Sequence, residues 1–525
     1  MIYIIHYCDW IPAFAGMTII IIIRKMFKKI LVANRGEIAV RIMRAAKELG
    51  VDSVAIFHEV DKEMPFVHYA DYAYKLESET PKAGYLDIQQ IIDIAKKSGA
   101  EAIHPGYGFL SENAKFSQAC ADAGLKFIGP KPYAIEVMGS KTKARELMAQ
   151  AGVPIVPGTK EKITDIKKAM EIAKELGYPV LLKAASGGGG KGMRKVFKQS
   201  EMSDSFDAAQ RESLKAFGDD SIYLEKFIES PKHIEIQIIA DEHGNYVHLG
   251  ERDCSIQRRH QKVIEEAPST VLTPELRQQM GEVAVNAAKA CGYVNAGTVE
   301  FLFDKNRNFY FLEMNTRLQV EHPVTELITG IDLAKEQICI AAGELLSFKQ
   351  EDITFRGHSI ECRIYAEDPF NNFLPDTGVI KYLREPGGKG VRVDSGVETG
   401  TEISIYFDPL LAKLVSWGKD RLEAISRMER ALKHYTIKGV KTTIPFELAV
   451  MKHPEFRYGY FDTGFIENSF DFEVLSNMKA EHDELIAAIA AYGYRIFRGS
   501  QVPLTNSKPH TSKWKQAELM LRRQG

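Results

Sequence analysis

The chain has 525 residues, of which 45% are hydrophobic and 26% are charged. That length exceeds what one compact core usually holds, so roughly two to four packed domains are expected. The 68 basic and 70 acidic residues leave a formal net charge of -2, which argues against a nucleic-acid partner. The 6 cysteines include no CxxC pair, which favours free thiols in a reducing cytoplasm over disulfides or structural zinc.

The first 25 residues differ from the rest of the chain. Their apolar stretch, 11–23, contains a proline and a glycine and is shorter than the roughly 20 residues that cross a bilayer. Its positive charges follow the apolar run, which is the wrong order for a secretory signal. We therefore expect a non-native extension over 1–25, a true start at Met26, and a cytoplasmic protein without a membrane partner. A membrane anchor is the alternative.

Residues 26–140 alternate short apolar runs with amphipathic stretches. Apolar runs such as KILVAN and VDSVAIF are typical of buried strands, and helices are predicted over 36–49 and 86–97. Strands that alternate with helices indicate a parallel sheet of the doubly wound type. The first domain is therefore predicted to be Rossmann-like.

A boundary is predicted after a helix over 141–151, where VPIVPG combines two prolines with a glycine. A second α/β segment extends from 141 to 343. The third segment, 355–467, is richer in alternating strand-like runs and is predicted to be α+β. In the remaining part, 468–525, an alanine-rich helix over 484–492 precedes a polar tail, to which we assign no structure.

The strongest local motif is YPVLLKAASGGGGKGM, residues 178–193. A predicted strand ends on Lys183 and leads into four glycines, whose backbone can approach an anion and direct N–H groups at it. The motif is not a P-loop, because Ala185 replaces the first glycine of that pattern and Gly192 replaces its hydroxyl residue. The G-x-G-x-x-G fingerprint is also missing after the first strand. We predict a loop that covers phosphates; a flexible hairpin tip is the alternative.

A second motif, EFLFDKNRNFYFLEMNTR at 300–317, predicts two strands joined by a turn. Glu313 and Asn315 are two positions apart and share a face, and Glu300 lies on the neighbouring strand, under ~5 Å away. Carboxylate and amide oxygens are ligands that Mg²⁺ takes when it bridges nucleotide phosphates. We predict that these three residues bind Mg²⁺ or Mn²⁺; a solvated acidic hairpin is the alternative.

The residues after this hairpin suggest an oxyanion site. Continued strand alternation would place Arg317, Gln319 and Glu321 on the side of Asn315. A guanidinium, an amide and a carboxylate in a row can hold a small planar oxyanion and abstract its proton. Surface ion pairing is the alternative.

Two further stretches carry weaker signals. The segment 251–266 is rich in basic residues, and this pattern alone leaves open whether it is a solvated face or an anion site. The segment 225–237 has a strand followed by a loop, in which backbone groups could contact an adenine edge while His233 faces the nucleotide.

The chain resembles the biotin carboxylases, a family of the ATP-grasp superfamily, from Met26 to Glu467. Six motifs occur in the same order as in that family: ILVANRGEIA, HPGYGFLSEN, KAASGGGGKGM, ERDCSIQRRHQK, EMNTRLQVEHPVTE and ECRIYAEDP. The resemblance is to the biotin carboxylase subunit of acetyl-CoA carboxylase or of a two-subunit pyruvate carboxylase. It implies a biotin carboxylase N-terminal domain over 26–140, an ATP-grasp domain with a mobile glycine-rich lid over 141–343, and a mixed α+β C-terminal domain over 355–467.

The resemblance also implies a set of site residues. The expected ATP-binding residues are Lys141, Lys183, Gly189, Gly190, Glu225, Lys226, Phe227, Ile228, His233, Gln257, His260, Glu300 and Glu313. The expected metal ligands are Glu300, Glu313 and Asn315. The expected bicarbonate pocket comprises Lys262, Arg317, Gln319, Val320 and Glu321. Arg363 is expected to face biotin, and the expected catalytic residues are Arg317, Glu321, Lys262 and Arg363.

The activity implied is ATP-dependent carboxylation of biotin by bicarbonate through carboxyphosphate, with Glu321 as the base and Arg363 stabilising the ureido oxyanion. This is the first half-reaction of an acyl-CoA or pyruvate carboxylase. The attachment sequence AMKM is missing, and the nearest approach is NMKA at 477–480. We therefore expect biotin on a separate biotin carboxyl carrier protein. No carboxyltransferase domain follows the third segment, so a separate carboxyltransferase subunit is also expected, and the resemblance suggests a homodimer of this chain.

Two other functions remain open on the sequence. An ATP-grasp ligase that forms another acylphosphate, such as a carbamoyl-phosphate or purine-pathway carboxylase, would share the lysine, the loop and the metal hairpin but would not need Arg363. A catalytically silent scaffold that binds nucleotide is the second alternative. The presence of every proposed catalytic side chain argues against it. Acetyl-CoA, propionyl-CoA and pyruvate are equally compatible with the sequence as final acceptors.

Overall fold

The computed structural model describes residues 26–499 apart from 160, 185–192 and 218–219. The expected extension over 1–25, the lid glycines Gly189 and Gly190, and the tail over 500–525 lie outside the described residues. The chain forms two units, Met1–Phe470 and Asp471–Gly525. In the part that the structure describes, no helix has both the length and the apolar character needed to cross a membrane.

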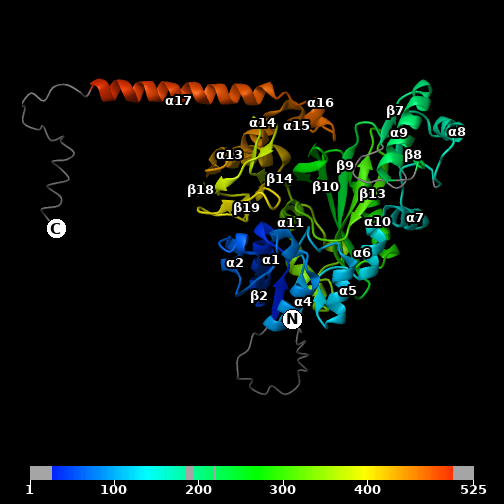
Figure 1. Ribbon diagram of the computed structural model, residues 1–525, viewed down its shortest axis with the longest axis horizontal. Helices are drawn as coiled ribbons and strands as arrows, with labels where there is room; N and C mark the ends of the chain where they lie inside the picture. The colour runs from blue at the N-terminus through cyan, green and yellow to red at the C-terminus, as the bar shows by residue number, and fades with distance from the viewer. Residues whose placement is uncertain (1–25, 160, 185–192, 218–219, 500–525) are drawn as a thin grey trace, which may run out of the picture. The chain divides into compact units, whose positions relative to one another are not determined.

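The first part of the chain is a five-stranded parallel sheet covered by helices on both faces, which confirms the predicted Rossmann-like arrangement (Figure 1). Its strands follow the order β3-β2-β1-β4-β5. Their bounds are β1 Lys29–Val32, β2 Asp52–Phe57, β3 Tyr72–Lys75, β4 Ala102–His104 and β5 Lys126–Phe127. The helices are α1 Gly36–Glu48, α2 Pro65–Tyr69, α3 Pro81–Tyr85, α4 Ile88–Ser98, α5 Ala114–Asp122 and α6 Pro132–Gly139.

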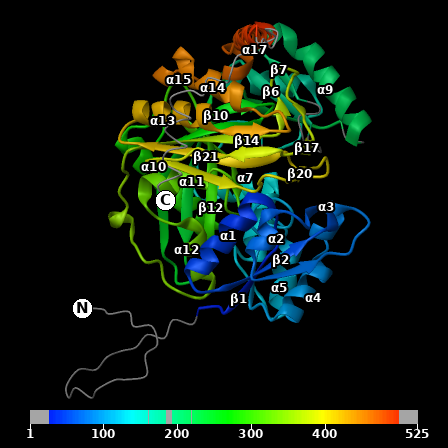
Figure 2. The ribbon, with the colours of Figure 1, turned by 90° about the vertical axis from the view of Figure 1, so that its left-hand side faces the viewer.

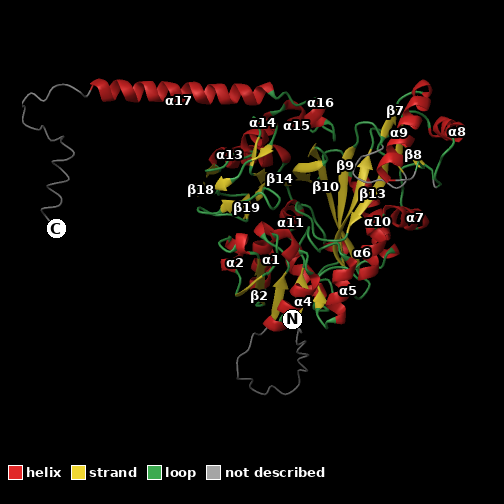
Figure 3. Cartoon of the chain, in the orientation of Figure 1, coloured by secondary structure: helices red, strands yellow, loops and turns green. Residues whose placement is uncertain are grey.

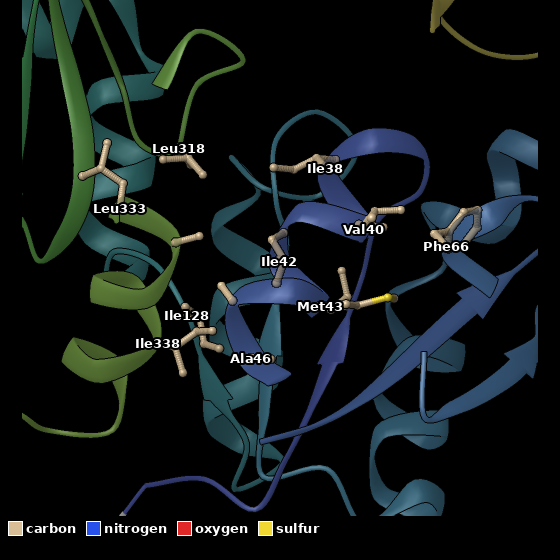
Figure 4. Close-up of a cluster of buried hydrophobic side chains, with 14 of the residues drawn as sticks. Ile38, Val40, Ile42, Met43, Ala46, Phe66, Ile128, Leu318, Leu333 and Ile338 are labelled. Atoms are coloured by element: carbon tan, nitrogen blue, oxygen red, sulfur yellow. The ribbon is translucent and has the colours of Figure 1, made fainter. Parts of the chain in front are cut away.

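Strand alternation distributes the core of this sheet over its two faces. Ile30 and Val32 of β1 belong to one buried cluster, while Leu31 belongs to another, because successive side chains of a strand point to opposite faces. The first cluster contains α1 and α12 (Leu333–Ala341). Figure 4 shows α1 between Phe66 on one side and Ile338 on the other. The first domain is thus joined to the centre of the molecule by a continuous apolar core.

The centre of the molecule is an eight-stranded antiparallel sheet of order β13-β12-β9-β10-β11-β14-β21-β19. Its strands are β9 Lys232–Ala240, β10 Tyr246–Arg258, β11 Gln261–Ala267, β12 Asn295–Phe303, β13 Phe309–Asn315, β14 His358–Tyr365, β19 Val391–Ser395 and β21 Leu410–Gly418. The first five belong to the second segment predicted from the sequence, and the last three belong to the third. Figure 2 shows β14 and β21 in the same layer as β10. Both segments therefore contribute to one hydrogen-bonded sheet.

One face of this sheet is apolar and the other is polar. Ile234, Ile236 and Ile238 of β9 pack in a buried cluster with residues of α10 (Pro274–Ala290). The alternate residues of β9, which include Glu235, must point to the opposite face. The polar face therefore arises from strict alternation in the sequence HIEIQI.

A smaller antiparallel sheet, of order β7-β6-β8, carries the start of the glycine motif. It consists of β6 Val180–Ala184, β7 Arg194–Val196 and β8 Ile222–Lys226, and it packs against α8 Ile166–Leu176 and α9 Met202–Phe217. Lys183 lies near the end of β6, as predicted.

The remaining elements complete the first unit and form the second (Figure 3). They are α7 Lys141–Gln150, α11 His322–Thr329, β15 Glu367–Asp368, β16 Leu374–Pro375, β17 Gly378–Val379, β18 Tyr382–Arg384, β20 Glu402–Ile403, α13 Arg421–His434, β22 Thr436–Lys438, α14 Ile444–Lys452, α15 Pro454–Tyr458 and α16 Phe465–Asn468, with short 3-10 turns at Glu59–Asp61, Gln199–Glu201 and Gln350–Asp352. The second unit contains α17 Glu473–Gly499. The predicted helix over 484–492 is thus part of a longer one.

Candidate active site

A row of charged side chains crosses the polar face of the central sheet. Glu300 of β12 is the register partner of both Glu313 on β13 and Glu235 on β9, and Glu235 is in turn the partner of Arg252 on β10. Directly opposed residues of neighbouring strands share a face and have Cβ atoms about 5 Å apart. Four strands therefore bring one positive and three negative groups into a line.

Lys262 on β11 lies at the centre of this site. Its Nζ donates to Glu235 Oε2 at 2.5 Å, Glu300 Oε1 at 2.8 Å and Glu321 Oε1 at 2.7 Å. Burial alone would lower the pKa of Lys262, but the three carboxylates outweigh burial and raise it well above its usual range. The ammonium group is therefore charged at neutral pH, and it links side chains of β9, β12 and the turn before α11.

The three predicted metal ligands lie together. Glu300 is buried and Glu313 is exposed, and Asn315 Nδ2 donates to Glu300 Oε1 at 2.8 Å. Desolvation and the neighbouring charge of Glu300 raise the pKa of Glu313, so the two opposed carboxylates repel each other. A divalent cation would relieve this repulsion, and the donors are carboxylate and amide oxygens, which suit Mg²⁺. The residues present therefore fit the metal.

The pairing at Glu300 involves an additional nitrogen base. His233 Nε2 lies 2.9 Å from Glu300 Oε2, and His233 Nδ1 lies 3.0 Å from Gln257 Nε2. Burial would raise the pKa of Glu300, but Lys262 and His233 together hold it well below its usual range. Glu300 is therefore ionised, as a metal ligand must be.

The prediction that the extended strand continues to Glu321 is wrong, because β13 ends at Asn315 and α11 begins at His322. The chain turns between them, and the turn still brings the polar side chains together. Arg317 Nη2 donates to Asn315 Oδ1 at 2.9 Å, and Gln319 Nε2 donates to Glu300 Oε1 at 2.9 Å.

Contacts with three other parts of the chain hold this turn in place. Leu318 is fully buried in the cluster that contains α1 (Figure 4), and the carbonyl of Val320 accepts a hydrogen bond from Lys413 Nζ at 3.0 Å. The Arg317 Nε atom lies 3.1 Å from Glu112 Oε2 of the N-terminal domain. Three separate elements thus fix the turn.

Arg363 on β14 connects the turn to the other end of the site. Its Nε donates to Glu265 Oε1 at 2.6 Å, and its Nη2 donates to Glu321 Oε2 at 2.9 Å. Burial would raise the pKa of Glu321, but Lys262, Arg363 and Arg252 outweigh it and hold the pKa well below its usual range. Glu321 is therefore ionised at neutral pH.

The basic stretch 251–266 proves to be divided between interior and surface. Arg252 is completely buried, whereas Arg259 and His260 are exposed at the turn of the β10–β11 hairpin. Arg258 pairs with Glu367 at 2.6 Å. His260 thus lies apart from the hydrogen-bonded network around Lys262.

Arg252 holds the network together. Its guanidinium pairs with Glu235 and donates to four uncharged side-chain oxygens: Gln237 Oε1, Thr298 Oγ1, Gln319 Oε1 and Thr325 Oγ1, at 2.7 to 3.1 Å. An arginine with five donors can satisfy such a cluster.

The residues expected to bind ATP fall into two groups. On the smaller sheet, Lys183 Nζ lies 2.5 Å from Glu225 Oε2, and Arg145 Nη1 lies 2.6 Å from Glu225 Oε1. Lys226 donates to the carbonyls of Gly177 and Tyr178.

The remaining members of this group lie at its margins. Phe227 packs edge-to-face against Phe197, and Ile228 is half-buried in the link to β9. Lys141 begins α7, and its charge lowers the pKa of Glu313, which places it beside the proposed metal site. The second group, with His233, Gln257 and Glu300, belongs to the central sheet.

Sequence reasoning missed three buried carboxylates: Glu235, Glu265 and Glu361. All three are fully buried. Glu235 and Glu361 occur in strands where apolar and polar residues alternate, whereas Glu265 is followed directly by a second buried glutamate, Glu266. An isolated charge at every second position of an apolar strand is the signal that could have identified Glu235 and Glu361; alternation gives no such signal for Glu265.

Three family models match the chain. They are the biotin carboxylase N-terminal domain at 26–135, the carbamoyl-phosphate synthase L chain ATP binding domain at 140–349, and the biotin carboxylase C-terminal domain at 361–468. The fold and the site thus define an ATP-binding enzyme of the carboxylase class.

Comparison with named relatives identifies the family to which the chain belongs. The chain is 56% identical to a pyruvate carboxylase subunit of Methanothermobacter thermautotrophicus over 442 residues, which cover 84% of this chain and 90% of that protein. It is 53% identical to biotin carboxylase 1 of Bacillus subtilis over 84% of this chain and 98% of that protein. A solved biotin carboxylase domain dimer of Hydrogenobacter thermophilus 2-oxoglutarate carboxylase, in complex with MgADP, ADP and bicarbonate, is 53% identical with a TM-score of 0.77, over 84% of this chain and 97% of that chain. The chain belongs to the biotin carboxylase family.

Proposed function

We propose that this chain uses ATP and bicarbonate to carboxylate biotin that is attached to a separate carrier protein. The observation that carries the proposal is the position of Lys262, whose Nζ contacts Glu300 and Glu321 at 2.8 and 2.7 Å. Glu321 in turn contacts Arg363 at 2.9 Å. The proposed metal ligand, the proposed base and the proposed biotin-binding arginine thus form one continuous hydrogen-bonded chain.

The nucleotide end of the site is built from carboxylates and lysines. Glu300, Glu313 and Asn315 would hold Mg²⁺ or Mn²⁺, and when bound the cation would screen the phosphate charge of ATP. Lys183, near the end of β6, and Lys141, at the start of α7, would approach the phosphates. The expected contacts of Gly189 and Gly190 remain part of the proposal.

Bicarbonate would bind in the turn that contains Arg317, Gln319 and Val320. Arg317 and Lys262 offer positive charge to the anion, and Glu321 is an ionised acceptor for its proton. Without a bound anion, the positive charges of Lys262 and Arg363 keep the basicity of Glu321 low. A bound bicarbonate offsets part of that positive field, so it raises the basicity of Glu321 when a proton must be accepted.

The chemistry then proceeds in two stages. The bicarbonate oxygen attacks the γ-phosphorus of ATP, ADP leaves, and Glu321 receives the bicarbonate proton. The resulting carboxyphosphate breaks into CO₂ and phosphate, and the phosphate removes the ureido N–H proton of biotin before the nitrogen attacks CO₂. Arg363 would stabilise the negative charge that develops on the ureido oxygen.

The names of the relatives suggest how this activity is used. They come from carboxylases of pyruvate, 2-oxoglutarate and methylcrotonoyl-CoA. These names differ in the final acceptor although the chains are about half identical to this one. We propose that a separate carboxyltransferase selects the acceptor, that a biotin carboxyl carrier protein delivers the biotin, and that this chain forms a homodimer in the cytoplasm.

The domain assignment also remains a proposal: an N-terminal domain over 26–140, an ATP-grasp domain over 141–343 and a C-terminal domain over 355–467. The parallel sheet supports the first of these. The second and third would be domains that share one sheet, since β11 pairs with β14.

The test is an assay of bicarbonate-dependent ADP release and carboxybiotin formation with free biotin. We expect biotin to accelerate ATP turnover in the wild-type protein. Arg363→Ala should abolish carboxybiotin formation while leaving ADP affinity, measured without bicarbonate, unchanged. Arg427→Ala is a matched control, since that arginine pairs with Glu423 on α13 outside the site. The proposal would be contradicted if the rate of ATP turnover were the same with and without biotin, or if Arg363→Ala lost affinity for ADP.

A further inference from the structure

Behind Arg363 lies a pair of glutamates that the proposed mechanism does not use. Glu265 of β11 and Glu361 of β14 are register partners, so their side chains leave the sheet on the same face at neighbouring positions. Both side chains are fully buried. Glu361 is two residues before Arg363 on the same strand, so it also shares the face of Arg363.

The two glutamates differ in their hydrogen bonds. Glu265 Oε1 accepts from Arg363 Nε at 2.6 Å. Among the described residues, Glu265 Oε2 and both carboxyl oxygens of Glu361 have no hydrogen-bond partner. A buried carboxylate without a donor is costly, whereas a buried neutral carboxyl group costs much less.

The cation that lowers the pKa of Glu361 most, Lys413, is shared with other carboxylates. Lys413 is the register partner of Arg363 on β21, and its Nζ donates to the Val320 carbonyl at 3.0 Å. The same Nζ lies 3.2 Å from Glu37 Oε2 and 3.7 Å from Asp394 Oδ2. Lys413 therefore already faces two other carboxylates.

The charged and titratable groups that act on Glu361 come from its own strand and from four other parts of the chain. They are Lys413 on β21, Glu265 on β11, Arg363 on β14, Glu321 in the turn before α11, and Tyr107 after β4. Burial raises the pKa of Glu361 well above its usual range; Lys413 and Arg363 lower it only in part, while Glu265 and Glu321 raise it further. Burial and the charge of Glu321 also raise the pKa of Glu265, to about 7, although Arg363 and Lys262 lower it in part. Two opposed carboxylates in such a setting share one proton. The proton belongs on Glu361, which has no donor, because Glu265 accepts a hydrogen bond from Arg363.

We propose that Glu361 is a positioning residue that stays protonated at neutral pH, so that Glu265 is left as the ionised partner that aims Arg363 at Glu321 and the biotin site. This role rests on the function proposed above. If Glu361 ionised, its charge would compete with Glu321 for the guanidinium from the same strand. Arg363 would then be drawn away from the ureido oxygen that it must stabilise.

The proposal predicts a distinct dependence of carboxylation on pH. As pH rises, ionisation of Glu361 should lower kcat/KM for biotin in the wild-type protein. Glu361→Gln places a neutral side chain of the same shape at this position, so this alkaline decline should disappear. Glu265→Gln removes the anchor of Arg363 and should lower kcat/KM for biotin by about tenfold or more, while the KM for ATP stays within about twofold.

The matched control is Glu447→Gln. Glu447 is also fully buried, and burial raises its pKa well above the usual range. It lies on α14, where its Oε1 accepts from Thr443 rather than from Arg363. The control should therefore keep the alkaline decline of the wild-type protein.

A second measurement tests the protonation without activity. A group whose folded pKa is raised stabilises the fold below its unfolded pKa, and this contribution is lost as pH rises toward the folded value. Urea unfolding at increasing pH should therefore show a smaller loss of stability in Glu361→Gln than in the wild-type protein. An identical pH slope in the two proteins, or an alkaline decline in kcat/KM that survives in Glu361→Gln, would overturn the proposal. A wild-type protein that forms no carboxybiotin at any pH would instead contradict the proposed function, and the unfolding slopes would still decide the protonation.

Discussion

Removal of the Arg252 guanidinium is the most direct test of the buried network. The side chain is completely inaccessible to solvent and pairs with Glu235. Arg252→Met keeps much of the volume and the apolar stem but leaves Glu235 with Lys262 as its remaining cation. Breaking a buried ion pair from one side costs about 3–5 kcal/mol. Because Lys262 still compensates Glu235, we expect a loss of about 3 kcal/mol at the lower end of that range.

The same substitution should impair bicarbonate use. Arg252 Nη2 donates to Gln319 Oε1 at 2.7 Å, so its loss frees a side chain of the proposed bicarbonate pocket. Urea unfolding would measure the stability change, and bicarbonate-dependent ADP release would measure activity at several bicarbonate concentrations. We expect KM for bicarbonate to rise by about tenfold, which corresponds to about 1.4 kcal/mol of lost binding.

Arg277→Met provides the control. Arg277 also pairs with a fully buried carboxylate, Glu251, at 2.6 Å, but outside the candidate site. It should lose stability without a change in the KM for bicarbonate. The expected role of Arg252 would be refuted if Arg252→Met lost less than about 1 kcal/mol, or if the two variants raised the KM equally.

Three further substitutions test other parts of the molecule. Burial would raise the pKa of Glu266, but Arg421 and His358 outweigh it and lower the pKa to about 2. The stability that ionised Glu266 contributes is therefore present above its ordinary pKa and is lost as pH falls toward 2. Glu266→Gln should lower the free energy of unfolding by up to about 3 kcal/mol near neutral pH. In a plot of urea midpoint against pH, the variant should show a smaller fall on the acid side than the wild-type protein. Leu318→Ala should destabilise the fold by about 2–5 kcal/mol and raise the KM for bicarbonate, as measured by calorimetry and ADP release. Lys183→Ala should change stability by less than about 0.5 kcal/mol, since its side chain is 36% exposed, but should weaken ATP binding in isothermal titration; unchanged affinity would remove Lys183 from the site.

Much of the fold follows from local patterns. Alternating apolar strands and amphipathic helices predict the parallel sheet, and the hairpin with Glu300 and Glu313 forms between the predicted strands. The helix limits agree within about two residues in the first domain. These features depend on residues that are close in the sequence, so periodicity and turn residues suffice to predict them.

The parts that could not be predicted depend on irregular pairing. Between Glu300 and Phe301 the partner on β13 moves from Glu313 to Phe311, so an extra residue places Glu313 opposite Glu300. A similar shift in β11 moves the partner of β10 from Ile264 to Lys262. It brings Lys262 to the face of Glu265. Without the shift, two strand residues three positions apart would point to opposite faces. Such bulges re-aim side chains near active sites. Alternation predicts that Glu313 and Asn315 share a face, but neither the register that sets Glu313 opposite Glu300 nor the face of Lys262 follows from it.

The antiparallel sheet also explains why the proposed catalytic geometry can be fixed in advance. Glu300, Lys262 and Arg363 lie on β12, β11 and β14, which belong to one hydrogen-bonded sheet. The distance from the proposed metal site to the proposed biotin site therefore cannot change without breaking strand pairs. Lys183, by contrast, belongs to the separate β7-β6-β8 sheet. The segment between α7 and α8 makes single bridges to both sheets, from Ile155 to Phe311 of β13 and from Gly158 to Glu225 of β8. If Lys183 binds ATP as proposed, it can adjust to the nucleotide while Glu321 and Arg363 keep their relation to each other, as the proposed reaction through an unstable carboxyphosphate requires.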